Sequence, residues 1–211
     1  MSNDEVLLIH EDKSIDKIDE KNPYMLGFPS VALSKEIHYM AWTTTPWTLP
    51  SNLGLTVGPH IEYVLVATYN PYTALPINVI LAKNLVSKYF KEEGEGKEGF
   101  AQGDKIIPWS IIETFKGSQL NGLRYEQLMP FEANAPKNIE GDPFKIVVGD
   151  FVTTEDGTGI VHTSPAFGAD DYKVGQKNNL GIITLVDREG KFVEGVGEFS
   201  GRFVKNYKDE K

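Results

Sequence analysis

The feature that most constrains this chain is a series of short apolar runs, rich in β-branched and aromatic residues and separated by Gly, Pro and Asn. Runs of this length and composition are typical of strands, and the residues between them are typical of turns. The spacing therefore predicts a mainly β domain. The predicted strands are His38–Thr44, Tyr63–Thr68, Ser110–Phe115, Phe144–Val148, Gly159–His162 and Ile182–Val186.

Helical patterns are fewer. Leu81, Leu85, Lys88 and Tyr89 fall on one face of a helix. The segment Asp170–Asn178 has acidic residues in its first turn and is soon followed by a glycine, which indicates a helix with both end signals. The predicted fold class is therefore mainly β with a few peripheral helices, an α+β arrangement.

The chain has 211 residues, a length that a single domain can accommodate. Residues 1–21 alternate acids and lysines, and we interpret them as a peripheral charged arm or the cut end of a longer chain. Residues 22–207 are predicted to form one domain, and residues 208–211 a charged tail. Residues 91–104 are rich in Gly and Glu and predict a solvated loop.

The composition excludes several kinds of chemistry. The chain has no Cys, which rules out disulfides, thiol nucleophiles and cysteine-based metal sites, and it has only four His. No nucleophile elbow surrounds Ser164, and the Gly-rich runs lack the Lys-Ser/Thr of a phosphate-binding loop. His162 with Asp170 and Asp171 is a sparse set of metal ligands. We therefore expect neither a metal nor another cofactor in this domain.

Charge and hydropathy limit the expected location of the protein and its binding partners. The formal net charge is −9, which argues against holding DNA or the body of an RNA on a broad basic face. No apolar run approaches the length of a membrane span, and the first residues lack the pattern of a signal peptide. We expect a cytoplasmic protein that binds neither membrane nor DNA.

One segment whose side chains could form a functional site is Trp42–Asn52, in which Thr43, Thr44 and Thr45 precede Pro46. Threonine hydroxyls at the end of a strand could line a small polar cleft. The alternative is a β-branched strand that enters a proline turn, with its hydroxyls bonded to the backbone. Threonine content alone favours that alternative.

The second segment, Gly157–Tyr172, combines a glycine turn, a short strand that ends near His162, a Pro/Gly loop and an acidic helix start. Small residues allow a ligand to approach the backbone closely. A lone His162 is more often structural than catalytic. Acidic residues in a first helical turn interact favourably with the helix dipole, so we interpret Asp170 as a helix-start charge.

Together, the two segments resemble the editing domain that is inserted in the catalytic domain of isoleucyl-tRNA synthetases. The strings that carry the resemblance occur in the family's order and read WTTTPWTLPSN and TTEDGTGIVHTSPAFGADDY. Editing domains for valine and leucine typically have Thr-Thr-Arg-Pro where this chain has Thr44-Thr45-Pro46-Trp47, which favours isoleucine. Ser164 departs from the family's usual Ala. The resemblance implies a β-barrel-like fold of the valyl, isoleucyl and leucyl type.

The resemblance also implies roles for individual residues. Asp171 resembles the carboxylate that pairs with the ammonium group of the substrate, a charge-assisted contact. His162 and Thr45 resemble residues of the pocket wall, with His162 supplying the bulk that excludes isoleucine. The remaining residues would contact the aminoacyl ester, the adenosine or a water molecule, and they are Thr43, Thr44, Thr48 and Asn52.

The implied reaction is hydrolysis of the ester of valyl-tRNA(Ile), with isoleucine excluded by size. Its partners would be the 3′ end of tRNA(Ile) carrying valine and the remainder of the synthetase, which would use ATP and Mg at a site absent from this chain. Two alternatives stay open from the residues alone. One is a free-standing deacylase that acts in trans, and the other is a non-catalytic tRNA-binding module of the same fold.

Overall fold

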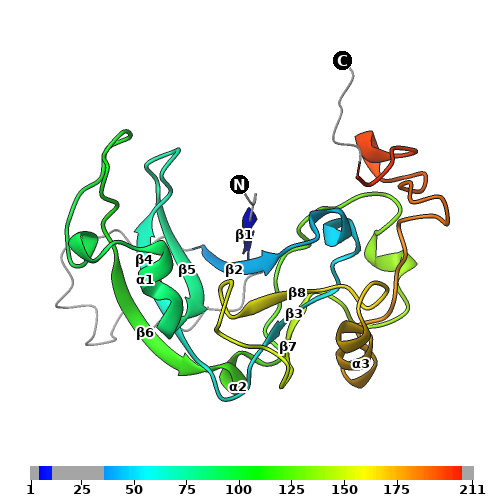
Figure 1. Ribbon diagram of the computed structural model, residues 1–211, viewed down its shortest axis with the longest axis horizontal. Helices are drawn as coiled ribbons and strands as arrows, with labels where there is room; N and C mark the ends of the chain where they lie inside the picture. Colours follow the sequence, from blue (N-terminus) through cyan, green and yellow to red (C-terminus); the bar gives the residue numbers. More distant parts are fainter. Residues whose placement is uncertain (1–4, 11–35, 206–211) are drawn as a thin grey trace.

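The structure, a computed structural model, describes residues 5–10 and 36–205 (Figure 1). Its centre is a curved, mixed sheet of eight strands in the order β6-β4-β5-β2-β8-β3-β7, with β1 paired to β2 beside this path. The sheet forms a half-barrel, which confirms the predicted fold class. The strands are β1 Glu5–His10, β2 Ile37–Thr43, β3 Gly54–Val57, β4 Glu62–Tyr69, β5 Pro76–Ala82, β6 Ser110–Lys116, β7 Lys145–Val148 and β8 Ile160–Thr163.

The strands β4 and β5 are buried on both faces. Tyr63 and Leu65 of β4 belong to one core cluster, whereas Val64 and Val66 belong to another on the opposite face. Successive side chains of a strand point to opposite faces, so a strand covered on both sides needs a continuous apolar run rather than an alternating one. The sequence from Tyr63 to Ala67 is such a run.

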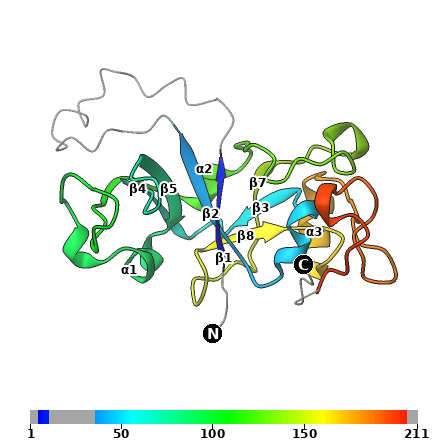
Figure 2. The same cartoon turned by 90° about the horizontal axis from the view of Figure 1, so that it is seen from above.

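The strands β2 and β8 bring the two sequence motifs together. They run parallel, with Trp42 opposite Val161, so both end at the same edge of the sheet. The strand β8 also pairs antiparallel with β3, where His162 lies opposite Leu55. Figure 2 shows β2 lying between the β4–β5 half and the β3–β8 half of the molecule. The end of β2 therefore lies beside the end of β8.

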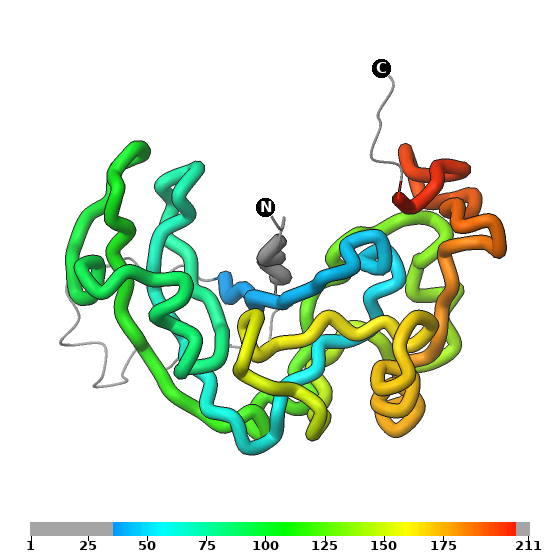
Figure 3. The backbone as a smooth tube through the Cα atoms, in the orientation of Figure 1, coloured from blue at the N-terminus to red at the C-terminus, as the bar shows by residue number. Residues whose placement is uncertain are grey.

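Helices are short and lie around the sheet. The longest α-helix, α3, follows β8 and contributes Val174 to a small core with Leu53 and Leu180. The backbone path in Figure 3 shows α3 and residues 183–205 at the end of the molecule opposite β4, β5 and β6. The helices within residues 36–205 are η2 Pro46–Ser51, η3 Lys83–Leu85, α1 Val86–Tyr89, η4 Glu92–Gly94, α2 Gly117–Leu120, η5 Pro136–Asn138, α3 Ala169–Lys177 and η6 Gly197–Phe199.

The structure confirms all but one of the predicted strands, to within a residue or two at their ends. The prediction for Ile182–Val186 is wrong, since this segment makes only an isolated bridge, between Val186 and Phe192. Its apolar residues serve a loop cluster instead, where Leu185 packs with Phe192 and Val196. Side-chain packing of irregular backbone produced the apolar pattern that suggested a strand.

Three strands were not predicted, namely β1, β3 and β5. The predicted helical face from Leu81 to Tyr89 is correct only at its end, because Leu81 belongs to β5 and α1 begins at Val86. The predicted helix Asp170–Asn178 is confirmed as α3, shifted by one residue.

The predicted domain boundaries, at residues 22 and 207, lie outside the described residues, as does the predicted tail 208–211. Within the predicted arm 1–21, the segment Glu5–His10 forms β1 and pairs antiparallel with β2. The predicted loop 91–104 contains η4 and an isolated bridge from Glu95 to Trp109. No helix in the described ranges is both long and apolar enough to cross a bilayer.

Candidate functional site

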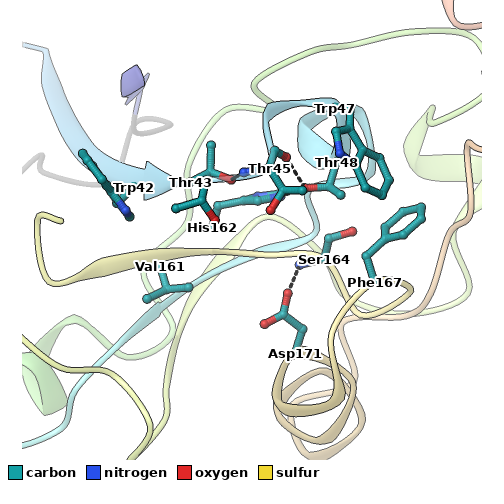
Figure 4. Close-up of a pocket in the computed structure, with 11 residues that line it drawn as sticks. Trp42, Thr43, Thr45, Trp47, Thr48, Val161, His162, Ser164, Phe167 and Asp171 are labelled. Carbon is teal, nitrogen blue, oxygen red and sulfur yellow. Dashed lines mark hydrogen bonds between the residues drawn. The ribbon is translucent and has the colours of Figure 1, made fainter. Parts of the chain in front are cut away.

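A pocket of about 230 Å³ lies where the ends of β2 and β8 meet the start of α3 (Figure 4). Pockets for drug-sized ligands are commonly ~300–1,000 Å³, so this one suits a smaller group at the end of a larger ligand. The residues that line it are Trp42, Thr43, Thr44, Thr45, Trp47, Thr48, Val161, His162, Ser164, Phe167 and Asp171.

The threonine run forms a tight turn at the end of β2. The Thr43 hydroxyl accepts a hydrogen bond from the Thr45 amide at 3.0 Å. The Thr45 carbonyl accepts from both the amide and the hydroxyl of Thr48, at 3.0 and 2.8 Å. These bonds satisfy backbone groups that have left the sheet, and Pro46 begins η2, where its missing N–H costs nothing. The backbone-bonded alternative therefore holds for Thr43 and Thr48, and both still line the pocket.

His162 is a buried polar side chain of the pocket, with 7% of its surface exposed. Its Nε2 lies 3.0 Å from the Thr48 hydroxyl, and its Nδ1 lies 2.8 Å from the Asn52 amide nitrogen. Burial lowers the pKa of His162 to about 4, and a hydrogen bond with the Thr48 backbone only partly opposes this. The ring is therefore a neutral, fixed part of the wall at neutral pH.

Asp171 lies in the first turn of α3, on the side of the pocket opposite the threonines in Figure 4. Its Oδ2 accepts a hydrogen bond from the Ser164 amide at 2.9 Å. Partial burial raises the pKa of Asp171, the Ser164 N–H lowers it, and neighbouring Asp170 raises it further. The Ser164 hydroxyl donates to the Ser51 carbonyl at 2.9 Å, which ties the loop after β8 to η2.

Aromatic side chains close the remaining sides. Trp47 and Phe167 meet edge to face, with ring centroids 5.2 Å apart, and lie together in Figure 4. Trp42 packs over the turn before β8, where Gly157 has a φ of +69°. A Cβ on Gly157 would lie 2.7 Å from Cγ of Trp42, so only glycine allows this close approach.

Most predicted site residues meet at this pocket. Its lining includes Thr43, Thr44, Thr45, Thr48, His162 and Asp171. Asn52 is different, because it is buried behind His162 and bonded within the protein. A direct contact of Asn52 with a substrate stays a prediction, and the geometry favours a supporting role.

Sequence reasoning missed several contributors. Trp42, Trp47, Val161, Ser164 and Phe167 line the pocket and were not named as site residues, although all lie within the two motifs. Their position in the motifs was a usable signal. Beyond the motifs, the buried Tyr125 donates to Asn52 at 2.6 Å, and no local pattern marks it.

No group of three His, Asp or Glu in the part of the chain that the structure describes could hold a metal ion. The expectation of a domain without metal or other cofactor stays a prediction.

Comparison with known proteins identifies the family of the chain. No protein-family model matches the chain. The isoleucine–tRNA ligase of Cytophaga hutchinsonii is 49% identical over 180 residues, and that of Porphyromonas gingivalis is 45% identical over 178 residues. These alignments cover 80% and 83% of this chain. The chain belongs to the isoleucine–tRNA ligase family. It spans only 16% and 15% of the two ligases' lengths.

A solved structure supports the fold of this region. The editing domain of the P. knowlesi cytosolic leucyl-tRNA synthetase matches with a TM-score of 0.52 and 16% identity, over 84% of this chain and 64% of that one. At this identity the likeness concerns the fold alone. Sequence and fold together identify the chain as the editing-domain region of an isoleucyl-tRNA synthetase, as the two motifs predicted.

Proposed function

We propose that this editing domain hydrolyses the ester bond of valyl-tRNA(Ile) and spares isoleucyl-tRNA(Ile). The observation that carries the proposal is the pairing, across one small pocket, of the carboxylate of Asp171 with the closed wall formed by His162 and Thr48. The first group suits the charged end of an amino acid, and the second limits the length of its side chain.

Asp171 would bind the ammonium group of the esterified amino acid. One carboxylate oxygen is held by the Ser164 amide, which fixes the orientation of the group in the pocket. Partial burial raises the pKa of Asp171 because the charged carboxylate loses hydration. A cation that pairs with the carboxylate offsets this loss of hydration. The same contact would orient the ester carbonyl for attack.

His162 would exclude isoleucine. A single hydrophobic pocket separates side chains that differ by one methylene by only about 1–3 kcal/mol, for which this synthetase family is itself the standard example. A second site that admits only the smaller side chain multiplies this selectivity. His162 suits the task because both ring nitrogens are engaged, so the ring cannot turn aside without breaking buried hydrogen bonds.

The chemical step would need only a positioned water. An aminoacyl ester is already activated, and holding the reactants in place supplies much of the acceleration. Thr44 is exposed and lines the pocket, and Thr45 follows it in the lining. The Thr45 hydroxyl has no hydrogen-bond partner among residues 5–10 and 36–205, so it can bind the water or the ribose. We propose no covalent intermediate.

Recognition of the tRNA body would come from the rest of the synthetase. A chain with a net charge of −9 is poorly suited to hold a polyanion on its own, and it spans a small part of its relatives. We accordingly propose that the domain receives the 3′ end of tRNA(Ile) in the cytoplasm, while ATP and Mg serve the synthetic site elsewhere in the ligase.

The test is a deacylation assay with tRNA(Ile) charged with radiolabelled valine or isoleucine. The chain at high concentration should release valine faster than isoleucine and faster than an Asp171→Ala variant purified in parallel. Equal, background-level release of both amino acids by the chain would reject catalysis and favour the non-catalytic module. Activity that does not increase when the domain is part of the full-length ligase would favour a deacylase that acts in trans.

A further inference from the structure

Behind the pocket, a buried chain of hydrogen bonds runs from Tyr125 to the threonine turn. The Tyr125 hydroxyl donates to Oδ1 of Asn52 at 2.6 Å, and the other end of that amide lies 2.8 Å from Nδ1 of His162. Nε2 of His162 then meets the Thr48 hydroxyl at 3.0 Å, and this hydroxyl donates to the Thr45 carbonyl at 2.8 Å. Tyr125 and Asn52 are 2% and 4% exposed, so water does not compete for these bonds.

The orientation of the Asn52 amide is fixed at both ends. Its nitrogen lies 2.9 Å from the Gly54 carbonyl, which can only accept a hydrogen bond, so the group that faces it must be the NH₂. The oxygen of the amide then faces Tyr125 and accepts from the hydroxyl. A rotated amide would place two carbonyl oxygens against each other at Gly54.

This orientation determines the tautomer of His162. The Asn52 NH₂ is a donor, so Nδ1 of His162 must accept and cannot carry a proton. The hydrogen of the Thr48 hydroxyl is directed to the Thr45 carbonyl, so Nε2 of His162 must donate. Every donor in this series of hydrogen bonds, from Tyr125 to the Thr45 carbonyl, has one acceptor only when His162 is neutral with its proton on Nε2.

We propose that Tyr125 is a positioning residue which, through Asn52, holds His162 in the Nε2–H tautomer and so fixes the ring that limits the size of the pocket. Its effect on the choice of amino acid rests on the function proposed above, whereas its effect on the tautomer does not. Tyr125 itself does not line the pocket.

Removal of the Tyr125 hydroxyl should loosen this arrangement. Oδ1 of Asn52 would be left buried without a donor, and a buried unsatisfied acceptor is unfavourable. The present orientation of the amide is then favoured only by its contact with Gly54, so the free-energy gap to the rotated amide narrows. The rotated amide presents Oδ1 to His162 and selects the Nδ1–H tautomer. That tautomer loses the donor to Thr48, so the ring is no longer held from both sides.

The primary measurement is the tautomer of His162, read from the ¹⁵N shifts and two-bond couplings of the imidazole in the labelled chain. With only four His in the sequence, the His162 signals can be assigned by comparison with a His162→Gln variant. The wild-type chain should show neutral Nε2–H at pH 7, and Tyr125→Phe should show a mixture that includes Nδ1–H.

Tyr63→Phe is the matched control. Tyr63 is also a buried tyrosine whose hydroxyl donates at 2.6 Å, in its case to the Gly159 carbonyl, while accepting from the Gly58 amide. Its loss should cost similar stability but leave the His162 tautomer unchanged. A His162 spectrum altered equally by both variants would reduce Tyr125 to a general structural role and overturn the proposal.

The second measurement is the ratio of isoleucyl to valyl ester hydrolysis. Tyr125→Phe should raise this ratio about five- to tenfold, and Tyr63→Phe should not. If neither the wild-type chain nor a variant hydrolyses either ester but Tyr125→Phe still changes the tautomer, the proposed function fails and the positioning role stands.

Asn52→Asp provides a second route if Tyr125→Phe folds poorly. A carboxylate in place of the NH₂ offers only acceptors to Nδ1, so His162 should carry a proton there. Wild-type His162 found as Nδ1–H, or unchanged in both Tyr125→Phe and Asn52→Asp, would overturn the proposal.

Discussion

The two sides of the pocket differ in how their polar groups are used. On the side formed by β2, η2 and β8, both ring nitrogens of His162 are bonded within the protein, and so is the hydroxyl of Thr48. On the side formed by α3, only one oxygen of Asp171 is bonded to a residue that the structure describes, namely to the Ser164 amide. Groups that are fully bonded define a shape, whereas a half-bonded carboxylate can still bind a ligand.

Burial acts on the two groups in opposite directions on the pH scale and for the same reason. It lowers the pKa of His162 and raises the pKa of Asp171, because in each case the charged form loses hydration. His162 is therefore neutral at neutral pH. Asp171 gains most from a cation that enters the pocket, which is the property expected of the substrate-binding side.

The largest effect should come from removing the charge of Asp171. Asp171→Asn keeps the size of the side chain but loses the ion pair with the substrate ammonium, and deacylation of valyl-tRNA(Ile) should fall about 100-fold, or ~3 kcal/mol. Single-turnover hydrolysis measures this directly. Acid should likewise reduce the wild-type rate, with a midpoint above the ordinary Asp pKa of 3.8 because burial raises the pKa of Asp171.

Asp170→Asn is the control for this variant. Asp170 is adjacent, exposed and paired with Lys173 at 3.3 Å, so the substitution makes the same change in net charge outside the pocket. Its rate should stay within about twofold of wild type, since surface ion pairs contribute little. Equal losses in both variants would indicate a long-range charge effect and remove the distinction between the two sides.

The second effect concerns the shape-defining side and needs no substrate. Between about pH 6.5 and pH 4 the unfolded chain binds a proton at His162 that the folded chain does not, so the free energy of unfolding should fall as pH falls through this window. The loss attributable to His162 should be about 2 kcal/mol on going from about pH 7.5 to about pH 5.

Urea unfolding of wild type and His162→Gln over this range isolates that contribution, because every other ionisable residue, Asp171 included, is present in both proteins. As pH is lowered, the free energy of unfolding of the wild type should fall relative to that of the variant. A constant difference between the two across the range would mean that His162 is not held neutral by burial.

The contrast between the two sides also explains what the sequence could predict. His162, Asp171 and the threonines lie inside two continuous motifs whose strands end at the same sheet edge, so pattern and resemblance were sufficient to name them. Tyr125 is 73 residues from Asn52 along the chain. Its amide donates to the Phe144 carbonyl just before β7, and β7 pairs with β3, so only the tertiary fold brings it to the pocket.

The fold was predictable where local pattern and burial agree. The strand β4 contains an unbroken apolar run, from Tyr63 to Ala67, and was recognised. The strand β3 is a four-residue segment beginning with Gly54, too short and too small in its side chains to stand out. The strand β5 is followed at once by η3 and α1, so apolar residues from a buried strand and a short helix merged into one helical spacing.

A third effect should follow from Thr48→Val, which keeps the shape and removes the hydroxyl. The Nε2–H of His162 then loses its acceptor in a buried site, which should cost about 1–3 kcal/mol in the free energy of unfolding. Thr44→Val, the same substitution at an exposed position of the same turn, should change stability by less than about 0.5 kcal/mol. Equal costs would show that neither hydrogen bond of the Thr48 hydroxyl, to His162 or to the Thr45 carbonyl, stabilises the fold.

The smallest expected effect is a change in selectivity when the wall itself is shortened. His162→Ala removes the bulk opposite Asp171 but leaves the carboxylate in place, so isoleucyl-tRNA(Ile) should become a substrate while valyl ester is still hydrolysed. The ratio of the two rates should rise about tenfold, or ~1.4 kcal/mol, the scale of one methylene in a pocket. Parallel time courses with both esters measure the ratio without requiring equal folded fractions. If the ratio stayed at the wild-type value while both rates fell, His162 would be acting on catalysis and not on size, and the two sides of the pocket would no longer have separate tasks.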